Sequence, residues 1–487
     1  MRQTLFHIPA EIFGLPLLGF HGLLFWGFLL GAGLWFIRSV LKRGLHSDDI
    51  GFVFVILLVA VVAGAFLPKI ADPHGLPIRG YGTLLVLAIA SASGLLMDRG
   101  CRKRRIPGDM MFSLVLWCVV SGLLGARVFH IIEYLPMYMN NPNPLGHMLL
   151  FTEGGLVVYG GIIGGMIGSA VFFWRNKLSP PAMYDVMAPA LLLGIAIGRL
   201  GCLMNGCCYG AVCDAAYGIT FPPTSPACYG QVFNNDTFVG GLKFVPYESG
   251  VAQETVAKNI STTAKTGGGC ACAGCGKRKI SQAEQERLDS LPAMIAEVKP
   301  DSPAALAGLK AGMIVRQIQV GNHAIHDLNT TQAKDYFYAL SLDYPNAGVL
   351  LTVTQPESAD GTQEFRFVMS PPEVLPVYPT QIMSFFGAIC LCLLILLLER
   401  FSKRDGFAFM LFLFLYSTGR FCIEFFRDDE ASFMGTGLSI AQNVSIAIFT
   451  LGIVVAVYIF SRPSRQALET RFPVVAENNR SRQGTTR

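Results

Sequence analysis

The stretch APALLLGIAIGRLGCLMNG (188–206) decides the class of fold, because it is an apolar run long enough to cross a membrane as a helix. It carries one permanent cation, Arg199, and no acidic residue. The whole chain of 487 residues is 52% hydrophobic and 15% charged, which excludes an ordinary soluble protein. A charge inside a membrane span is costly and usually faces the bundle interior or a cavity, so Arg199 marks a candidate functional site.

Similar apolar runs recur along the chain and predict an all-α polytopic membrane protein with about nine transmembrane helices. The expected spans are residues 16–37, 51–68, 80–98, 111–132, 155–174, 186–205, 380–399, 407–426 and 438–460. Lys and Arg cluster after every odd-numbered span, as expected of cytoplasmic loops. The N-terminus is therefore expected outside and the C-terminus inside, with residues 461–487 forming a disordered cytoplasmic tail. Because the basic residues mark topology, we expect no nucleic-acid partner.

The first two spans read as a duplicate of the next two. Residues 14–66 align without a gap on 75–127, and the two copies share a Gly-Leu-Pro start and three basic residues, Arg38, Lys42 and Arg43, which recur as Arg99, Lys103 and Arg104. Arg79 and Arg127 of the second copy are Leu and Phe in the first. We therefore expect residues 1–74 to be an additional membrane hairpin without polar function.

The segment between the sixth and seventh spans lacks any long apolar run and is expected to lie outside the membrane. Residues 206–280 are rich in Cys and Gly and are expected to be irregular and extracytoplasmic. In an oxidising exterior its cysteines favour disulfides, whereas the CACAGC motif at 270–275 leaves metal binding open. We assign no metal site and no cofactor.

Arginines gather at one depth when this topology is applied. Arg79, Arg127, Arg199 and Arg420 all fall at the outer ends of spans, and Arg420 shares a helical face with Glu424 and Arg427. Ordinary ion pairs or snorkelling side chains are the simpler interpretation. An excess of guanidinium at outer-leaflet depth instead indicates an external anion, and the phosphate of a phospholipid headgroup is the anion at that depth.

Four motifs then resemble a known family. EGGLVVYGGIIGG (153–165), GRLGCLMNGCCYG (198–210), YPTQ (378–381) and GRFCIEFFR (419–427) stand in the order of the bacterial prolipoprotein diacylglyceryl transferases. The similarity covers about 75–210 and 376–460, so residues 75–205 and 373–460 are expected to form the two parts of the transferase membrane core.

The resemblance implies a reaction and a set of site residues. The diacylglyceryl group of phosphatidylglycerol passes to the lipobox cysteine thiol of a prolipoprotein, at the outer leaflet of the cytoplasmic (inner) membrane. The expected catalytic residues are Tyr159, Arg199, Arg420 and Glu424, with the two arginines binding phosphate and Glu424 orienting Arg420. The expected substrate-binding residues are Arg79, Tyr81, Arg127, Gly160, Gly161, Asn205, Gly210, Gln381 and Arg427.

Several positions depart from the family pattern, among them those after YPTQ, where the usual Tyr and Glu are missing. Many members carry His, a proposed base, where this chain has Tyr159, and a tyrosine with its ordinary pKa near 10 is a poorer base. Cys202 replaces an asparagine of the signature, and Cys207 stands where an acidic residue is common. A catalytically lapsed, lipid-binding relative that serves as a membrane-anchored interaction protein is therefore the alternative.

Residues 281–372 resemble an inserted PDZ domain, an α/β module. AMIAEVKPDSPAALAGLKAGMIVRQIQVGNHAI (293–325) carries the pattern, and strands are expected at 348–355 and 365–370. PDZ domains add an extended peptide to a sheet edge, so an exported or envelope peptide is the expected ligand, with a plain spacer as the alternative. The chain has no HExxH or GxSxG motif, which argues against a protease. A transporter would instead place its polar residues at the membrane midplane.

Overall fold

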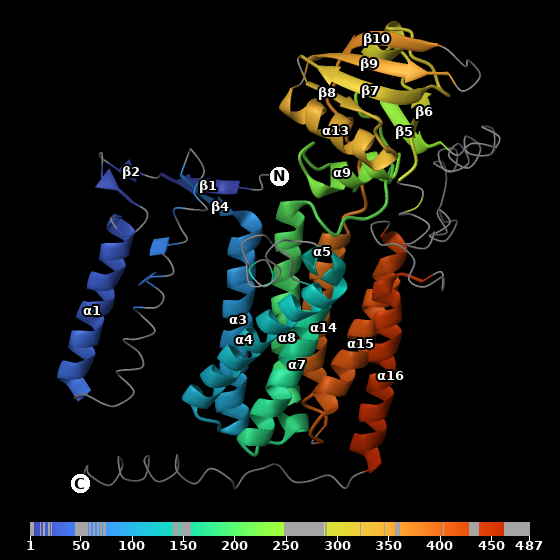
Figure 1. Ribbon diagram of the computed structural model, residues 1–487. Helices are drawn as coiled ribbons and strands as arrows, with labels where there is room; N and C mark the ends of the chain where they lie inside the picture. Colours follow the sequence, from blue (N-terminus) through green and yellow to red (C-terminus); the bar gives the residue numbers. More distant parts are fainter. Residues whose placement is uncertain are drawn as a thin grey trace, which may run out of the picture. The chain divides into compact units, whose positions relative to one another are not determined.

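The computed structural model is described in two units, residues 1–86 and 87–487 (Figure 1). The described residues are 4–9, 11–12, 15–17, 20, 22–43, 57, 60–61, 64–65, 68, 71, 75–139, 146, 148, 157–247, 287, 290–321, 323–344, 346–355, 361–402, 404–427 and 438–461. The CACAGC motif, the tail after 461 and most of the expected second span lie outside them.

The N-terminal unit holds strands that the apolar pattern does not predict. β1 (Thr4–Ile8) pairs antiparallel with β4 (Leu76–Arg79), and β2 (Glu11–Ile12) pairs with β3 (Leu15–Pro16). α1 (Leu23–Arg43) follows, and it ends at the residue that aligns with the end of α3 (Gly80–Arg104) in the proposed duplication. That duplication remains a prediction.

Six helices are long and apolar enough to cross a membrane. They are α3 (Gly80–Arg104), α4 (Gly108–Glu133), α8 (Pro180–Asn205), α14 (Thr380–Leu398), α15 (Phe407–Ile423, continued by the 3-10 turn η2, Glu424–Phe426) and α16 (Ile440–Ser461). The 18-residue α7 (Val158–Arg175) occupies the expected fifth span. A multi-pass membrane protein is therefore confirmed, whereas the count of nine spans remains a prediction.

Glycines let α4 and α7 pack backbone to backbone. A Cβ built on Gly160 would lie 2.5 Å from the carbonyl oxygen of Gly125, and one on Gly164 would lie 2.4 Å from that of Ser121. Only glycine allows so close an approach, which is the usual role of small residues between membrane helices. A short helix, α5 (Leu135–Met139), follows α4.

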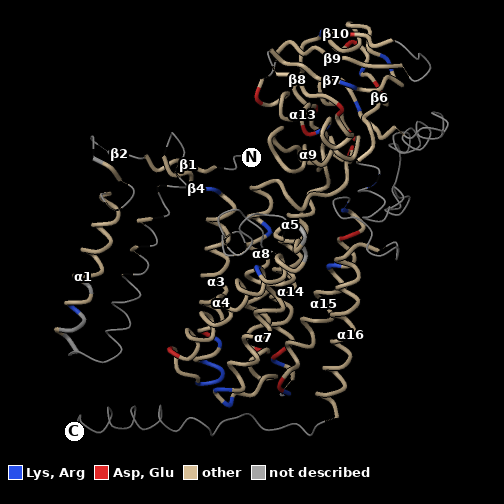
Figure 2. The backbone as a smooth tube through the Cα atoms, in the orientation of Figure 1, with Lys and Arg blue, Asp and Glu red and all other residues tan. Residues whose placement is uncertain are grey.

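Ion pairs and hydrogen bonds of buried charged residues link the ends of α3, α8, α14 and α15 at which basic residues gather. Arg99 donates to both oxygens of Glu399, which also accepts from Lys103, while Asp185 accepts the N–H groups that open α15, at 2.6 and 2.9 Å. Figure 2 shows Lys and Arg residues gathered where α3, α7 and α14 end. The end of α8 that carries Arg199 lies a helix length away from this basic end.

The segment between α8 and α14 folds around an antiparallel sheet of order β10-β9-β7-β6-β5, with β8 paired to β7 (Figure 1). Its strands are β5 (Leu242–Pro246), β6 (Ala293–Val298), β7 (Ile314–Val320), β8 (His323–His326), β9 (Gly348–Thr354) and β10 (Thr362–Val368). Its helices are α9 (Pro226–Phe233), α12 (Pro303–Leu306) and α13 (Thr330–Asp343). Phe244, Ile295, Phe337 and Leu351 lie in its buried core.

Part of the expected irregular segment 206–280 is in fact ordered. α9 begins after the N-cap Ser225, and β5 pairs with β6 over five residues. The sequence does not predict β5, because LKFVP is a short apolar run within a segment rich in Gly and Cys. Its side chains are buried in the structure, where β5 pairs with β6. The strands expected at 348–355 and 365–370 are present as β9 and β10.

Candidate active site at the carboxyl end of helix α8

A left-handed turn ends α8 and starts the loop of the candidate site. Gly206 has φ +75°, and its N–H bonds to the carbonyl oxygens of Cys202 and Leu203. Glycine is the usual residue at such a helix end because it adopts positive φ without a Cβ clash. The chain then turns back toward the beginning of α14.

Gly210 lies where three backbones meet. Its N–H bonds to the carbonyl oxygen of Tyr378 at 3.1 Å, and the next N–H, of Ala211, bonds to that of Phe426 at 2.9 Å. A Cβ on Gly210 would lie 2.6 Å from the Tyr378 Cβ and 2.8 Å from both carbonyl oxygens. The signature glycine is therefore required by packing.

The beginning of α14 fastens the same loop from the other side. The Gln381 amide donates to the carbonyl oxygen of Cys207 at 2.9 Å, and the Thr380 hydroxyl donates to that of Cys208 at 2.8 Å. Gln381 is 1% exposed, and its Oε1 is buried without a hydrogen-bond partner in the described part of the chain. A buried acceptor without a donor is costly, so a ligand with an N–H or O–H group fits here.

Arg199 lies in the last turns of α8, close enough to Cys202, Cys208, Tyr416 and Arg427 to interact electrostatically. Within the described residues it makes no ion pair with a carboxylate. The pKa of the Cys208 thiol is lowered, because Cys202 and Cys207 donate hydrogen bonds to it and the guanidinium groups of Arg199 and Arg427 add positive charge. Arg199 thus leaves positive charge for a further anion.

One buried carboxylate organises the other two arginines. Glu424 is 2% exposed; it pairs with Arg420 one turn earlier and lies 3.7 Å from the Arg427 guanidinium. The Ser439 hydroxyl donates to its other oxygen at 2.9 Å. The pairing of Arg420 with Glu424 expected from their spacing is confirmed.

Ser439 is a contribution that sequence reasoning missed. It begins α16 through reciprocal bonds with Gln442, a capping box that the S-x-x-Q spacing could have revealed. Tyr416 was missed as well, because no motif links it to Arg199. Thr380 was not among the expected site residues, although the motif YPTQ contains it.

Arg127, Tyr159, Gly160 and Gly161 belong to the α4 and α7 pair. Arg127 is 4% exposed, donates to the carbonyl oxygen of Met148 at 3.0 Å and lies over the Tyr138 ring. Tyr159 is half-buried in the first turn of α7. Gly160 and Gly161 face α4, so both contribute to helix packing.

Asn205, Arg79 and Tyr81 complete the expected set. Asn205 ends α8, and its amide hydrogen-bonds to the Cys207 thiol. Arg79 is the last residue of β4, where it pairs with Thr4, and Tyr81 is exposed in the first turn of α3. These last two belong to the N-terminal unit.

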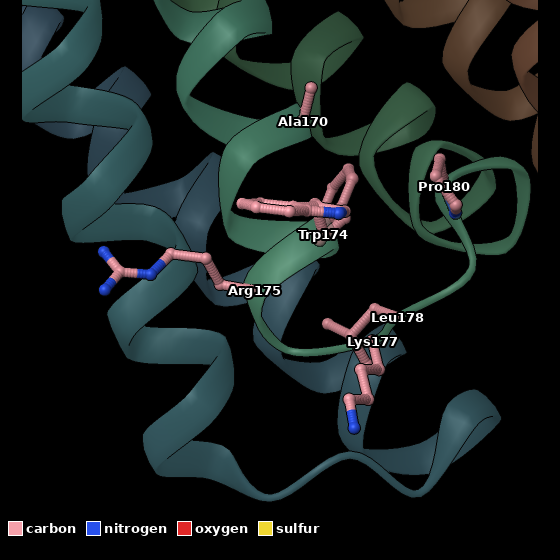
Figure 3. Close-up of a pocket in the computed structure, with 7 residues that line it drawn as sticks. Ala170, Trp174, Arg175, Lys177, Leu178 and Pro180 are labelled. Carbon is pink, nitrogen blue, oxygen red and sulfur yellow. The ribbon is translucent and has the colours of Figure 1, made fainter.

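A surface hollow at the turn from α7 to α8 is a different feature (Figure 3). It is lined by Ala170, Phe173, Trp174, Arg175, Lys177, Leu178 and Pro180. Trp174 is 81% exposed, and the side chains of Arg175 and Lys177 extend in different directions. Diverging cations around an exposed tryptophan are typical of a membrane-interface anchor rather than of a ligand site.

The fold and the site define a class of protein: a polytopic membrane protein in which Arg199 and the Arg420–Glu424–Arg427 group lie near one end of the helical bundle. The family described as prolipoprotein diacylglyceryl transferase matches residues 68–239 and 332–458. The chain belongs to this family, and the resemblance found in its motifs is confirmed.

Curated relatives agree with the family match. A phosphatidylglycerol–prolipoprotein diacylglyceryl transferase of Rhodopirellula baltica is 29% identical over 485 residues, which cover 93% of this chain and 88% of that protein. Enzymes of the same name are 37% identical over 160 residues in Clostridium perfringens and 31% over 154 in Clostridium tetani. Each of these two alignments covers 32% of this chain and 60% of the relative.

Proposed function

We propose that this protein transfers the diacylglyceryl group of phosphatidylglycerol to the lipobox cysteine thiol of prolipoproteins, the first step of bacterial lipoprotein maturation. The family match and the names of the relatives support this activity. The observation that carries it is Arg199, half-buried in the last turns of α8 near Arg427 and without an ion pair to a carboxylate in the described residues.

The phosphate of the lipid headgroup is the anion proposed for this site. Arg199 and Arg420 bind it, and Glu424 holds Arg420 in place through their ion pair. Guanidinium groups suit phosphate because they donate two parallel hydrogen bonds to its oxygens. Held in position before the reaction, they also stabilise the charge that grows on the leaving phosphate.

The reaction exchanges one bond at the glyceryl carbon. The acceptor thiol loses its proton, its sulfur attacks the carbon that carries the phosphate ester, and the carbon–oxygen bond breaks. The products are a thioether and glycerol phosphate. Tyr159, in its phenolate form, is the proposed base that takes the thiol proton. The buried Oε1 of Gln381 is a proposed acceptor for an N–H or O–H group of a substrate.

Arg79, Tyr81 and Arg127 are proposed to contact the lipid or the signal peptide from the first half of the membrane core. Gly160, Gly161, Asn205 and Gly210 are proposed to shape the site by close packing, which their contacts support. The site faces the outer leaflet of the bacterial inner membrane, and the gathering of basic residues at the other ends of the helices supports this orientation (Figure 2).

The α/β domain is proposed to be PDZ-like and to bind an extended peptide from an exported or envelope protein. In the described sheet β5, β8 and β10 each pair with one neighbouring strand, and a peptide strand pairs with such an edge through backbone hydrogen bonds. The ordered β5 extends the proposed domain beyond its expected limits of 281–372.

Complementation tests the activity. The protein is expressed in a bacterium depleted of its own transferase, and prolipoprotein maturation is followed by gel shift. Wild type should restore maturation and Arg199→Ala should not. Arg366→Ala changes an exposed arginine of β10 and is the matched control.

Transfer by purified protein from phosphatidylglycerol vesicles to a lipobox peptide separates inactivity from host incompatibility. Release of glycerol phosphate that disappears in Arg199→Ala supports the proposal. A well-folded wild type without transfer in this assay would establish the lapsed, lipid-binding alternative.

A further inference from the structure

Three cysteine thiols gather at the end of α8, and the proposed transfer reaction uses none of them. The Sγ atoms of Cys202, Cys207 and Cys208 all lie within 4.8 Å of one another. Each residue is half-buried, neither exposed to bulk solvent nor packed into the apolar core. Cys202 and Cys207 are also two of the positions where this chain departs from its family.

Contacts independent of the thiols hold the three residues in this arrangement. Cys202 lies in the last turn of α8, and its carbonyl oxygen accepts the N–H groups of Gly206 at 2.9 Å and Cys207 at 3.1 Å. Cys208 has φ +57°, a left-handed conformation uncommon for a residue with a side chain. The carbonyl oxygens of Cys207 and Cys208 are fixed by Gln381 and Thr380. The cluster is therefore preformed.

The separations fit sulfur ligands around one metal ion. A zinc–sulfur bond is about 2.3 Å, so two sulfurs of a tetrahedral site lie about 3.8 Å apart. Three thiolates would fill three positions and leave the fourth open. A disulfide would use only two of the three sulfurs.

The charges and hydrogen bonds around the cluster also favour thiolates. Arg199 and Arg427 lie close enough to Cys208 to interact with it electrostatically, and the Asn205 amide hydrogen-bonds to the Cys207 thiol. Outer hydrogen bonds of this kind orient metal ligands.

We propose that Cys202, Cys207 and Cys208 form a binding site for one thiophilic d10 metal ion, Zn2+ or Cu+. Thiolates select these soft ions over the hard cations Mg2+ and Ca2+. The ion ties the last turn of α8 to the loop at 206–211, and thereby fixes the backbone that packs against α14. This inference stands whether or not the chain transfers lipid.

Metal titration of the full-length protein in detergent tests the proposal. The protein is reduced under anaerobic conditions, and Cys270, Cys272 and Cys275 are changed to Ser so that their thiols do not compete. One arm titrates Zn2+ and the other Cu+, each against a competing chromophoric chelator. We expect one equivalent of at least one ion.

The ligand variants and their controls decide whether the cluster holds that ion. Cys202→Ser, Cys207→Ser and Cys208→Ser should each weaken binding by at least about tenfold, because each removes one first-shell thiolate. Cys390→Ser and Cys422→Ser change exposed cysteines of α14 and α15 and should leave binding unchanged.

Cobalt provides a readout that does not depend on the variants folding. Co2+ should bind the protein in which Cys270, Cys272 and Cys275 are Ser and the three proposed ligands are intact. The complex should show thiolate-to-cobalt charge-transfer absorption and the d–d bands of tetrahedral geometry. Zn2+ should also raise the temperature of unfolding, because it binds the folded state. No metal uptake, uptake unchanged in all three ligand variants, or a disulfide from Cys202 to Cys207 or Cys208 in protein purified from cells would each overturn the proposal.

Discussion

Glu424→Gln is the change that most directly tests how the arginines are held. The substitution keeps the size of the side chain and removes its charge. The carboxylate is 1% exposed at its side chain and is shared by Arg420 and Arg427, whose side chains are 15% and 6% exposed. The variant therefore removes the carboxylate charge that these two mostly buried guanidinium groups share.

The structure sets the size of the expected effect. Breaking a buried ion pair by removing one partner costs about 3–5 kcal/mol. The Ser439 hydroxyl, at 2.9 Å, can still donate to the amide oxygen of Gln, so the loss of stability should fall near the lower limit. An arginine displaced by about 1 Å from the phosphate should lower the transfer rate by about a hundredfold.

A double-mutant cycle measures the interaction itself. Thermal unfolding and lipid transfer are recorded for Glu424→Gln, Arg420→Gln and the double variant. Residues in one ion-pair network should show a coupling of about 0.5–3 kcal/mol. Glu364→Gln, which changes an exposed carboxylate of β10, is the control and should behave as wild type.

Additivity of the two changes would refute the assignment. If the double variant loses as much stability and activity as the sum of the single variants, Glu424 does not hold Arg420 in place. Wild-type transfer by Glu424→Gln would likewise show that the reaction needs no oriented Arg420.

Three further perturbations test other parts of the structure. Gly210→Ala should lower the free energy of unfolding by about 1–3 kcal/mol, because its Cβ would lie 2.6 Å from that of Tyr378. Gly198→Ala, whose Cβ would lie in open space on α8, is the control and should leave stability unchanged. Equal unfolding temperatures for Gly210→Ala and Gly198→Ala would contradict the packing argument. Asp185→Asn should lower the free energy of unfolding by about 1–3 kcal/mol, because it weakens the hydrogen bonds that the carboxylate accepts from the N–H groups at the start of α15. A melting curve like that of the wild type would disprove this role. Burial raises the pKa of the Cys228 thiol from its ordinary value of 9.0 to about 11, so on raising the pH the unfolded chain loses this proton before the folded chain does. The contribution of this thiol to the free energy of unfolding should therefore be fully present below pH 9 and be lost as pH rises through 11. Cys228→Ser should flatten this decline, which circular dichroism can follow.

The membrane helices and the Arg420–Glu424 pair could be predicted because both depend on neighbours in sequence. A span is defined by the length of its own apolar run, and residues four apart share a helical face whatever surrounds them. The same logic found the strands β9 and β10, which alternate apolar and polar side chains.

Features that depend on distant partners could not be predicted. Ser439 reaches Glu424 only because α16 packs beside α15. β5 is recognisable as a strand only once β6 is paired to it. β1 and β4 are separated by more than sixty residues in sequence, and no local periodicity links them. The cysteine cluster forms because the left-handed turn after α8 folds Cys207 and Cys208 back toward Cys202.

The inserted domain leaves the arginine site intact because its two connections are joined to each other. Val377 bridges both Val212 and Ile219, and the N–H of Tyr378 bonds to the carbonyl oxygen of Ala211 at 3.0 Å. The chain thus leaves and re-enters the bundle at one place next to Gly210, where these backbone contacts form a clamp between residues 211–219 and residues 377–378. The residues on the bundle side of this clamp, on α8 and α15, lie within the two ranges that match the family, whereas β5 to β8 lie in the unmatched gap. These backbone contacts therefore join the inserted domain directly to the loop that follows α8.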